Sequence, residues 1–358
     1  MLVVLFCSSA AWATDIEVSG KYSLRGQYIS NDSSLSEDAN SYMYYDQDFN
    51  LTTKYAINDA TFVSMRAAMV DYDWGENRNL SGSLSGTTLT LSQNVDDNIS
   101  IERLWGGHTF GNGGKLEFGL MTGASWATAF GDNAGGKYRI KYTHPMGDAT
   151  LYAIVEKQHE EGSRTPNTED AENDDTDAYY LAASFKAGEI NILPLLAYVT
   201  IGSSDIDQEQ DQTNWTFDLG FDGAAGNIGY EGEIIYNSFD PDGGDSWNTY
   251  GAYVNGWFNH GAGKLGLALA YGSWDDDEGK GFGMGEDFGD TIIVGSGWAG
   301  FGSTSLKSSG GKDMWEFSAA TLGWLYGDYA VSDDLTINGR FAYGMSNEDS
   351  VDWEDATF

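Results

Sequence analysis

Basic side chains recur at every second residue in several segments of this sequence. The clearest example is GKYRIKY (136–142), in which Lys137, Arg139 and Lys141 alternate with aromatic and aliphatic residues. In an extended strand, residues with this period share one face. Fixed charges that face water attract or repel ions, and rings of them set the selectivity of pores. The same parity in other segments carries Lys21, Arg25, Lys54, Arg66, Lys264 and Arg340, and the acids Asp218, Glu231 and Glu233.

The sequence offers little for catalysis or metal binding. Its four histidines, at positions 108, 144, 159 and 260, are scattered, and its single cysteine is Cys7. It contains no zinc-type cluster, phosphate-binding loop or dinucleotide fingerprint. The formal net charge of −37 would repel nucleic-acid phosphates. We therefore expect no enzymatic activity, no cofactor and no nucleic-acid partner.

The first residues have the features of an export signal. MLVVLFCSSAAWA (1–13) combines an apolar run with an Ala-Trp-Ala ending, which is typical of a secretory signal peptide. The usual basic start is missing, which suggests that the sequence begins late in the peptide. We expect residues 1–13 to be a signal peptide and residues 14–358 to form the exported domain.

Apolar and polar residues alternate through most of the chain. Between Ile16 and Tyr28 the even positions are apolar or glycine and the odd positions are polar. About fifteen segments of roughly 8–13 residues follow this pattern, and those with weaker or two-sided alternation are 99–109, 115–122, 149–157, 178–186, 190–201, 248–258 and 314–329. Short turns alternate with long acidic loops, such as EDAENDD (169–175) and DIDQEQD (205–211). An antiparallel meander whose two ends face different environments has connections of this kind.

A soluble β-sandwich and a membrane-spanning barrel could both show this alternation. Strands of soluble proteins average about 5–6 residues, whereas tilted membrane strands need about 9–11. A ring of about fifteen such strands is too wide for side chains to fill, so its interior must be wet. The apolar face then lies outside, where it suits lipid and not water. We expect an all-β, antiparallel transmembrane β-barrel with short periplasmic turns and long extracellular loops.

Two segments do not fit a regular strand. Pro194 lies inside the apolar run 190–201, where we expect a β-bulge to accommodate it. The final segment, NEDSVDWEDATF, has charges on the parity that should face lipid, and it is interpreted as a loop entering a strand that this chain lacks. The intact barrel would then have about 16 strands, or 18, with the C-terminal strand or strands missing here.

The middle of the chain resembles the general porins of Gram-negative outer membranes. The matching positions in 101–157 are Glu102-Arg103, Gly106-Gly107, Gly111, Gly119 and the strand from Tyr138 to Tyr142. In that family the loop after the glycine-ended strand folds into the lumen. The resemblance therefore implies a water-filled trimeric channel in the outer membrane. Residues 122–136 would constrict it, and ions and small hydrophilic solutes would pass by passive diffusion.

The resemblance also implies roles for individual residues. Ser125, Asp132 and Asn133 would lie on the constriction loop, with Asp132 as its acid. The basic wall facing the loop would be Arg25, Arg66, Lys137, Arg139 and Lys141, and other lumen residues would be Lys21, Lys54, Asp218, Glu231, Glu233 and Arg340. A single loop acid favours anions, whereas the acidic mouth favours cations, so the ion selectivity stays open. The implied partners are outer-membrane lipid, lipopolysaccharide and further copies of the chain as a homotrimer.

Two alternatives remain open at this point. A substrate-specific channel for sugars or carboxylates would place aromatic residues along the lumen, where Tyr180 is among the few on the polar parity. A secreted, calcium-loaded adhesin would use the Asp-rich loops instead. In a channel, too, these loops offer the oxygen ligands that Ca²⁺ prefers, including for bridges to lipopolysaccharide phosphates.

Overall fold

The computed structural model describes most of the strands and short turns, and parts of the longer connections. The described residues are 15–29, 42–73, 80–85, 88–93, 99–123, 126–132, 135–159, 175–202, 211–275, 280–285, 288, 319–332 and 335–347. The chain divides into two compact units, Met1–Met121 and Thr122–Phe358. Within the described residues, no helix has both the length and the apolar character needed to cross a bilayer.

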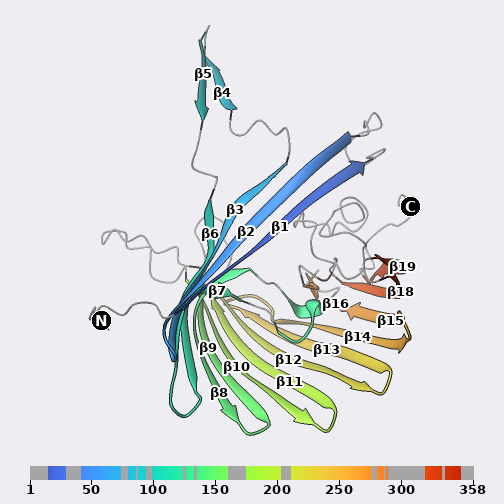
Figure 1. Ribbon diagram of the computed structural model, residues 1–358. Coiled ribbons are helices and arrows are strands. Elements are labelled where there is room, and N and C mark those ends of the chain that lie inside the picture. Colours follow the sequence, from blue (N-terminus) through green and yellow to red (C-terminus); the bar gives the residue numbers. More distant parts are fainter. Residues whose placement is uncertain are drawn as a thin grey trace. The chain divides into compact units, whose positions relative to one another are not determined.

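Fifteen strands follow one another in chain order in one antiparallel sheet, β1-β2-β3-β6-β7-β8-β9-β10-β11-β12-β13-β14-β15-β18-β19. The first unit contains β1 (Asp15–Ile29), β2 (Tyr42–Asn58), β3 (Thr61–Asp73), β6 (Ser100–Thr109) and β7 (Lys115–Thr122), and a separate hairpin of β4 (Leu80–Ser85) and β5 (Thr88–Gln93). The second unit contains β8 (Gly136–Met146), β9 (Ala149–His159), β10 (Thr176–Ala187), β11 (Ile190–Ile201), β12 (Gln212–Ala225), β13 (Ile228–Pro241), β14 (Trp247–His260), β15 (Gly263–Gly272), β18 (Ala320–Ser332) and β19 (Leu335–Ser346). There β16 (Trp274–Asp275) pairs with β17 (Lys280–Gly281), and Figure 1 shows β8 to β15 running side by side. The predicted all-β, antiparallel meander is confirmed.

The two faces of the strands differ as the alternation predicts. On β15, Leu265, Leu267 and Leu269 are each more than half exposed, whereas Ala268 and Ala270 between them are buried. On the other strands, too, exposed apolar side chains occupy every second position and so share one face. Among them are Ile16, Val18, Ile140, Leu181, Phe217, Ile234, Val254 and Phe341. Such a face is unfavourable in water and suits hydrocarbon.

Four short connections of the second unit are two-residue turns that begin with glycine. Gly147, Gly188, Gly226 and Gly261 have φ between 56° and 69°, a region that other residues rarely adopt. Glycine at the first central position is typical of the type II′ turn, whose twist matches that of the strands it joins. Because these turns use only two residues, the strands are longer than predicted: β13 and β14 have 14 residues each.

Pro194 is accommodated without the expected bulge. The ladder between β11 and β12 keeps one register past Pro194, which lies opposite Leu219. On the other side, the pairing with β10 stops at Ala182–Leu195 and resumes at Phe185–Ile192 in the same register. Proline has no N–H to donate, so the ladder loses rungs there while the strand stays straight.

The face assignment predicts opposite outcomes for two neighbouring residues of β19. Phe341 is 74% exposed on the apolar face, and Ala342 is exposed on the polar face. We expect Phe341→Arg to destabilise the folded protein in lipid by about 2–4 kcal/mol, because arginine in hydrocarbon is costly. Ala342→Arg should be tolerated. Urea unfolding in liposomes measures both, and equal destabilisation by the two substitutions would contradict the assignment.

Candidate functional site

Residues 126–132 of the predicted constriction loop lie on the polar face of β12 and β13. The backbone N–H of Thr128 donates to Glu233 of β13 at 3.1 Å, and the Thr128 hydroxyl donates to the same carboxylate oxygen. Gly131 also lies against Glu233 and Ile235, and Glu233 is fully buried. The loop therefore covers the polar face of the strands, the face that the alternation assigns to the interior.

Three neighbouring strands hold three successive residues of this loop. The indole N–H of Trp126 donates to the backbone oxygen of Leu193 on β11 at 3.0 Å. Ala127 has φ of 47°, in the left-handed region. It lies against Gly220 of β12, where a Cβ would overlap the Cβ of Ala127. Thr128 then binds β13, so the attachment needs both an uncommon backbone conformation and a glycine beneath it.

The loop continues as a single 3-10 turn, η1 (Ala129–Gly131). The Thr128 hydroxyl accepts a hydrogen bond from the backbone N–H of Phe130 at 3.1 Å, so it caps the turn while it donates to Glu233. The ring of Phe130 is fully buried, with its centroid 5.9 Å from that of Tyr253 on β14. The turn therefore faces the sheet through one polar and one aromatic contact.

Carboxylates gather beneath and beside the loop. Asp218 of β12 and Glu233 are buried. Glu231 is partly buried and accepts hydrogen bonds from the hydroxyl of Tyr253 and the side-chain amide of Asn255, both at 3.0 Å. A cavity of about 460 Å³ is lined by Trp126, Ala127, Thr128, Ala129, Asp132, Glu231 and Tyr253. Its charged lining residues are both acids.

One of the predicted basic residues of β8 is neutralised by an acid. The guanidinium of Arg139 pairs with Glu156 of β9, and both side chains are buried. The other carboxylate oxygen of Glu156 accepts from the amide of Gln158 at 3.0 Å and from the hydroxyl of Tyr180 at 3.4 Å. A buried, hydrogen-bonded pair of this kind contributes little net field to the space beside it.

The other two bases of β8 lie beside the start of the loop. The stem of Lys137 lies against Gly123, where a Cβ would overlap it. The ammonium of Lys141 is 5.4 Å from the ring centroid of Tyr152, and Tyr152 meets Trp126 edge to face at 5.4 Å between centroids. The bases of β8 thus lie towards the Trp126 end of the loop, and the carboxylates towards the other end.

Predicted lumen residues of the first unit form partly exposed ion pairs. Arg66 Nε lies 2.7 Å from Glu102, and Lys54 Nζ lies 3.3 Å from Glu17. Lys21 is exposed on the same face of β1 as Glu17. Ion pairs that water reaches contribute little to stability.

The remaining predicted residues fall into two groups. In the second unit Arg340 is exposed on β19, with its guanidinium carbon 5.9 Å from the ring centroid of Tyr326. Ser125, Asn133 and the side chain of Arg25 lie outside the described residues. The roles proposed for all these residues in ion passage stay predictions.

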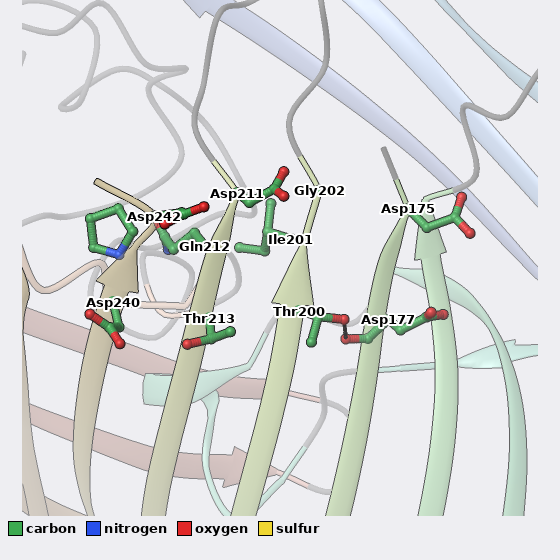
Figure 2. A pocket seen from close by; sticks show the side chains of 11 residues that line it. Asp175, Asp177, Thr200, Ile201, Gly202, Asp211, Gln212, Thr213, Asp240 and Asp242 are labelled. Carbon is green, nitrogen blue, oxygen red and sulfur yellow. Dashed lines mark hydrogen bonds between the residues drawn. The ribbon is translucent and has the colours of Figure 1, made fainter. Parts of the chain in front are cut away.

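Five aspartates surround a second cavity, of about 660 Å³, at the long-loop ends of β10 to β13 (Figure 2). They are Asp175, Asp177, Asp211, Asp240 and Asp242. Lys157 Nζ lies 2.5 Å from Asp175 and 3.4 Å from Asp177, which offsets part of this charge. Within the described part of the chain, no three His, Cys, Asp or Glu side chains are grouped to hold a metal ion. Most of the acidic runs at 169–175 and 205–211 lies outside it, and calcium binding stays a prediction.

The aromatic residues packed around the loop were not predicted from the sequence to lie there. Tyr253 of β14 and Trp324 and Tyr326 of β18 are buried on the inner faces of strands whose alternation is weak or two-sided in the sequence. Weak or two-sided alternation was the available signal, but five other segments share it, so it could not locate these residues. Phe130, inside the loop itself, gave no periodic signal.

Comparisons with known proteins identify the fold. No protein-family model and no curated protein matches the sequence. Among solved structures, the trimer form of OmpT, an outer membrane protein of Vibrio cholerae, aligns with a TM-score of 0.50 and 12% identity, over 92% of this chain and 88% of that one. An OmpT variant that lacks loop L8 aligns with a TM-score of 0.50 and 11% identity, over 92% and 93%.

Porins are also among the similar structures. An anion-selective porin from Comamonas acidovorans aligns with a TM-score of 0.49 and 13% identity, over 92% of this chain and 89% of that one. At these identities the likeness concerns the fold. The two alignments with OmpT show that the chain has the antiparallel fold of outer-membrane β-barrels.

The attachment of the loop to β13 gives a second prediction. Thr128→Val removes the hydroxyl that donates to Glu233 and caps η1, which should weaken the attachment by about 1–2 kcal/mol. We expect a roughly fivefold or greater rise in brief closures or current noise in single-channel recordings. Thr336→Val, at an exposed position of β19, is the matched control. Equal noise in the two variants would show that the hydroxyl does not hold the loop.

Proposed function

We propose that this protein is an outer-membrane porin that forms a water-filled channel for passive diffusion of ions and small hydrophilic solutes. The observation that carries the proposal is the attachment of residues 126–132 to the polar face of β11, β12 and β13. A loop on that face narrows the interior of a barrel without filling it. The exposed apolar side chains on the opposite face support a location in lipid.

The charges near the loop support a preference for cations. Asp132 and Glu231 line the cavity beside the loop, whereas Arg139 on β8 is paired with Glu156. The aspartates at the long-loop ends of β10 to β13 add negative potential where solutes would enter. We therefore favour cation selectivity over the anion preference that a single loop acid suggested.

Several finer properties belong to the same proposal. A homotrimer is supported by the trimer form of the similar OmpT structure. Outer-membrane lipid and lipopolysaccharide are the partners that the apolar face and the acidic loops would meet. Residues 1–13 would direct export and be removed. The protein would act as a channel and not as an enzyme.

A substrate-specific channel is the second candidate considered. Such a channel presents aromatic faces to the passing solute, and the inner faces of β14 and β18 do carry Tyr253, Trp324 and Tyr326. Each of the three is less than a tenth exposed, because they pack against one another and against loop residues. They cannot stack on a solute in this arrangement, so a general diffusion pore is favoured.

Planar-bilayer recording of the purified protein tests the proposal. We expect stepwise, ohmic conductance increases, in groups of three equal levels if each copy of a trimer is open. Reversal potentials in a salt gradient give the ion preference. A folded, membrane-inserted protein that conducts no ions would contradict the proposal.

The selectivity itself gives a third prediction. Asp132→Asn combined with Glu231→Gln removes two charges beside the loop while keeping the acceptor oxygens for Tyr253 and Asn255. One charge near 4 Å in water interacts by about 1 kcal/mol, so the cation-to-anion permeability ratio should fall about two- to fivefold. Asp148→Asn, in the exposed turn between β8 and β9, is the control. An unchanged reversal potential in the double variant would place the selective charges elsewhere.

A further inference from the structure

A second connection, which follows β15 in the sequence, also contacts residues 126–132 of the loop. It consists of residues 280–285 and Phe288, which are together called the 280–288 segment below. The backbone of Phe282 makes hydrogen bonds to two other parts of the chain. Its N–H donates to the backbone oxygen of Ser273 at 2.9 Å, and its oxygen accepts from the N–H of Ala319 at 3.0 Å. The N–H of Gly285 donates to the backbone oxygen of Phe130 at 2.7 Å. The segment is thus fixed to the chain next to β15 and β18 and directly to η1.

The side chains of the two segments form one apolar cluster. Phe282, Met284 and Phe288 are almost fully buried, as is Phe130. The Phe130 ring lies 5.3 Å from that of Phe282, stacked, and 5.2 Å from that of Phe288, edge to face. Aromatic pairs at these separations gain energy beyond the burial of their area.

The cluster rests on the inner face of β14 and β18. Phe288 meets Tyr253 and Trp324 edge to face, at 5.3 and 5.7 Å between centroids, and Tyr253 stacks on Trp324 at 6.0 Å. Phe130 stacks on Tyr253. Phe130 is therefore enclosed between the sheet and the 280–288 segment, and part of the interior face is dry.

Close backbone approach makes this contact sensitive to size. A Cβ placed on Gly285 would overlap the backbone oxygens of Ala129 and Asp132. Backbone atoms cannot rotate away as side-chain ends can, so either segment would have to shift. Position 285 therefore requires glycine for the two segments to meet as they do.

We infer that the 280–288 segment is a second constriction element, which locks residues 126–132 in place through Phe130. This inference rests on the proposed function, since it concerns the width and steadiness of the same passage. Glu233 and Gly220 hold the loop from the side of β12 and β13, and the 280–288 segment holds it from the side of β14 and β18. With both contacts intact the loop cannot swing, and the open channel has one conductance level. Phe282 and Phe288 thus help to determine permeability although they lie about 150 residues from the loop.

Two pairs of alanine substitutions test the lock. Phe282→Ala with Phe288→Ala removes it, and Phe217→Ala with Phe258→Ala is the matched control, because these two rings are 46% exposed on the outer face. We expect the first pair to raise the time spent outside the main conductance level at least about tenfold, since loss of two buried rings greatly weakens the packing of Phe130. The control variant should spend as little time outside the main conductance level as the unmodified protein. A folded first-pair variant with unmodified traces would overturn the inference.

A smaller change covers the case in which the double variant does not fold. Gly285→Ala adds one methyl group at the contact with η1, and Gly256→Ala adds one on β14 where no atom lies within 4 Å. We expect extra conductance levels only in Gly285→Ala. Identical traces for the two alanine variants would count against the lock.

Chemical labelling of a thiol does not depend on ion conduction, so it separates this inference from the proposed function. Ala129→Cys in a Cys7→Ser background gives a single thiol, on η1 beside the cluster. We expect a water-soluble maleimide to label it at least about tenfold faster when Phe282 and Phe288 are both alanine. Faster labelling in a protein that does not conduct would support the lock and contradict the channel. Equal labelling rates would overturn the lock even if the protein conducts.

Discussion

The strands of the main sheet must pair their backbones with their neighbours while each keeps an apolar outer face. This constraint determines the rest of the structure. Because of it, apolar side chains recur at every second residue through strands of 10–17 residues; only β7, with 8 residues, is shorter. It also makes the turns tight, because each residue spent on a turn is lost to the ladder. Pro194 shows how strict the constraint is: the ladder loses rungs to β10, but the register, and with it the face of each following residue, is preserved.

The polar face is the more varied of the two, because it is used for different purposes along the second unit. On β8 and β9 it holds the buried pair of Arg139 and Glu156. On β12 and β13 it supplies Gly220 and Glu233, on which the loop is fixed. On β14, β15 and β18 it is mostly small or aromatic and is covered by Phe130 and the 280–288 segment. The inner face therefore changes along the second unit from charged on β8 and β9 to mostly apolar on β14, β15 and β18.

Small and large residues are complementary where the segments meet the sheet. Ala268 and Ala270 on β15 leave room for the buried rings around Trp324, and Gly251 on β14 lies beneath the Phe282 ring. Glycines elsewhere allow turns, but at positions 220 and 285 the missing side chain sets how closely two backbones approach. Close packing of this kind fixes a loop more firmly than hydrogen bonds to water-accessible groups would.

The sequence by itself determined the class, the faces and the alternation of short and long connections, because these follow from the period of each strand and from local turn chemistry. The resemblance of residues 101–157 to porins predicted a constriction loop at 122–136, and the described residues 126–132 lie on the polar face of β11 to β13. The sequence could not show that Arg139 is paired with Glu156, or that Thr128 binds Glu233, because these partners lie 17 and 105 residues apart and meet only through the register of the sheet. The tertiary structure alone decided that Phe130 is enclosed by residues 280–288. Apolar residues in a long connection carry no period, so only the packed arrangement reveals which face they cover.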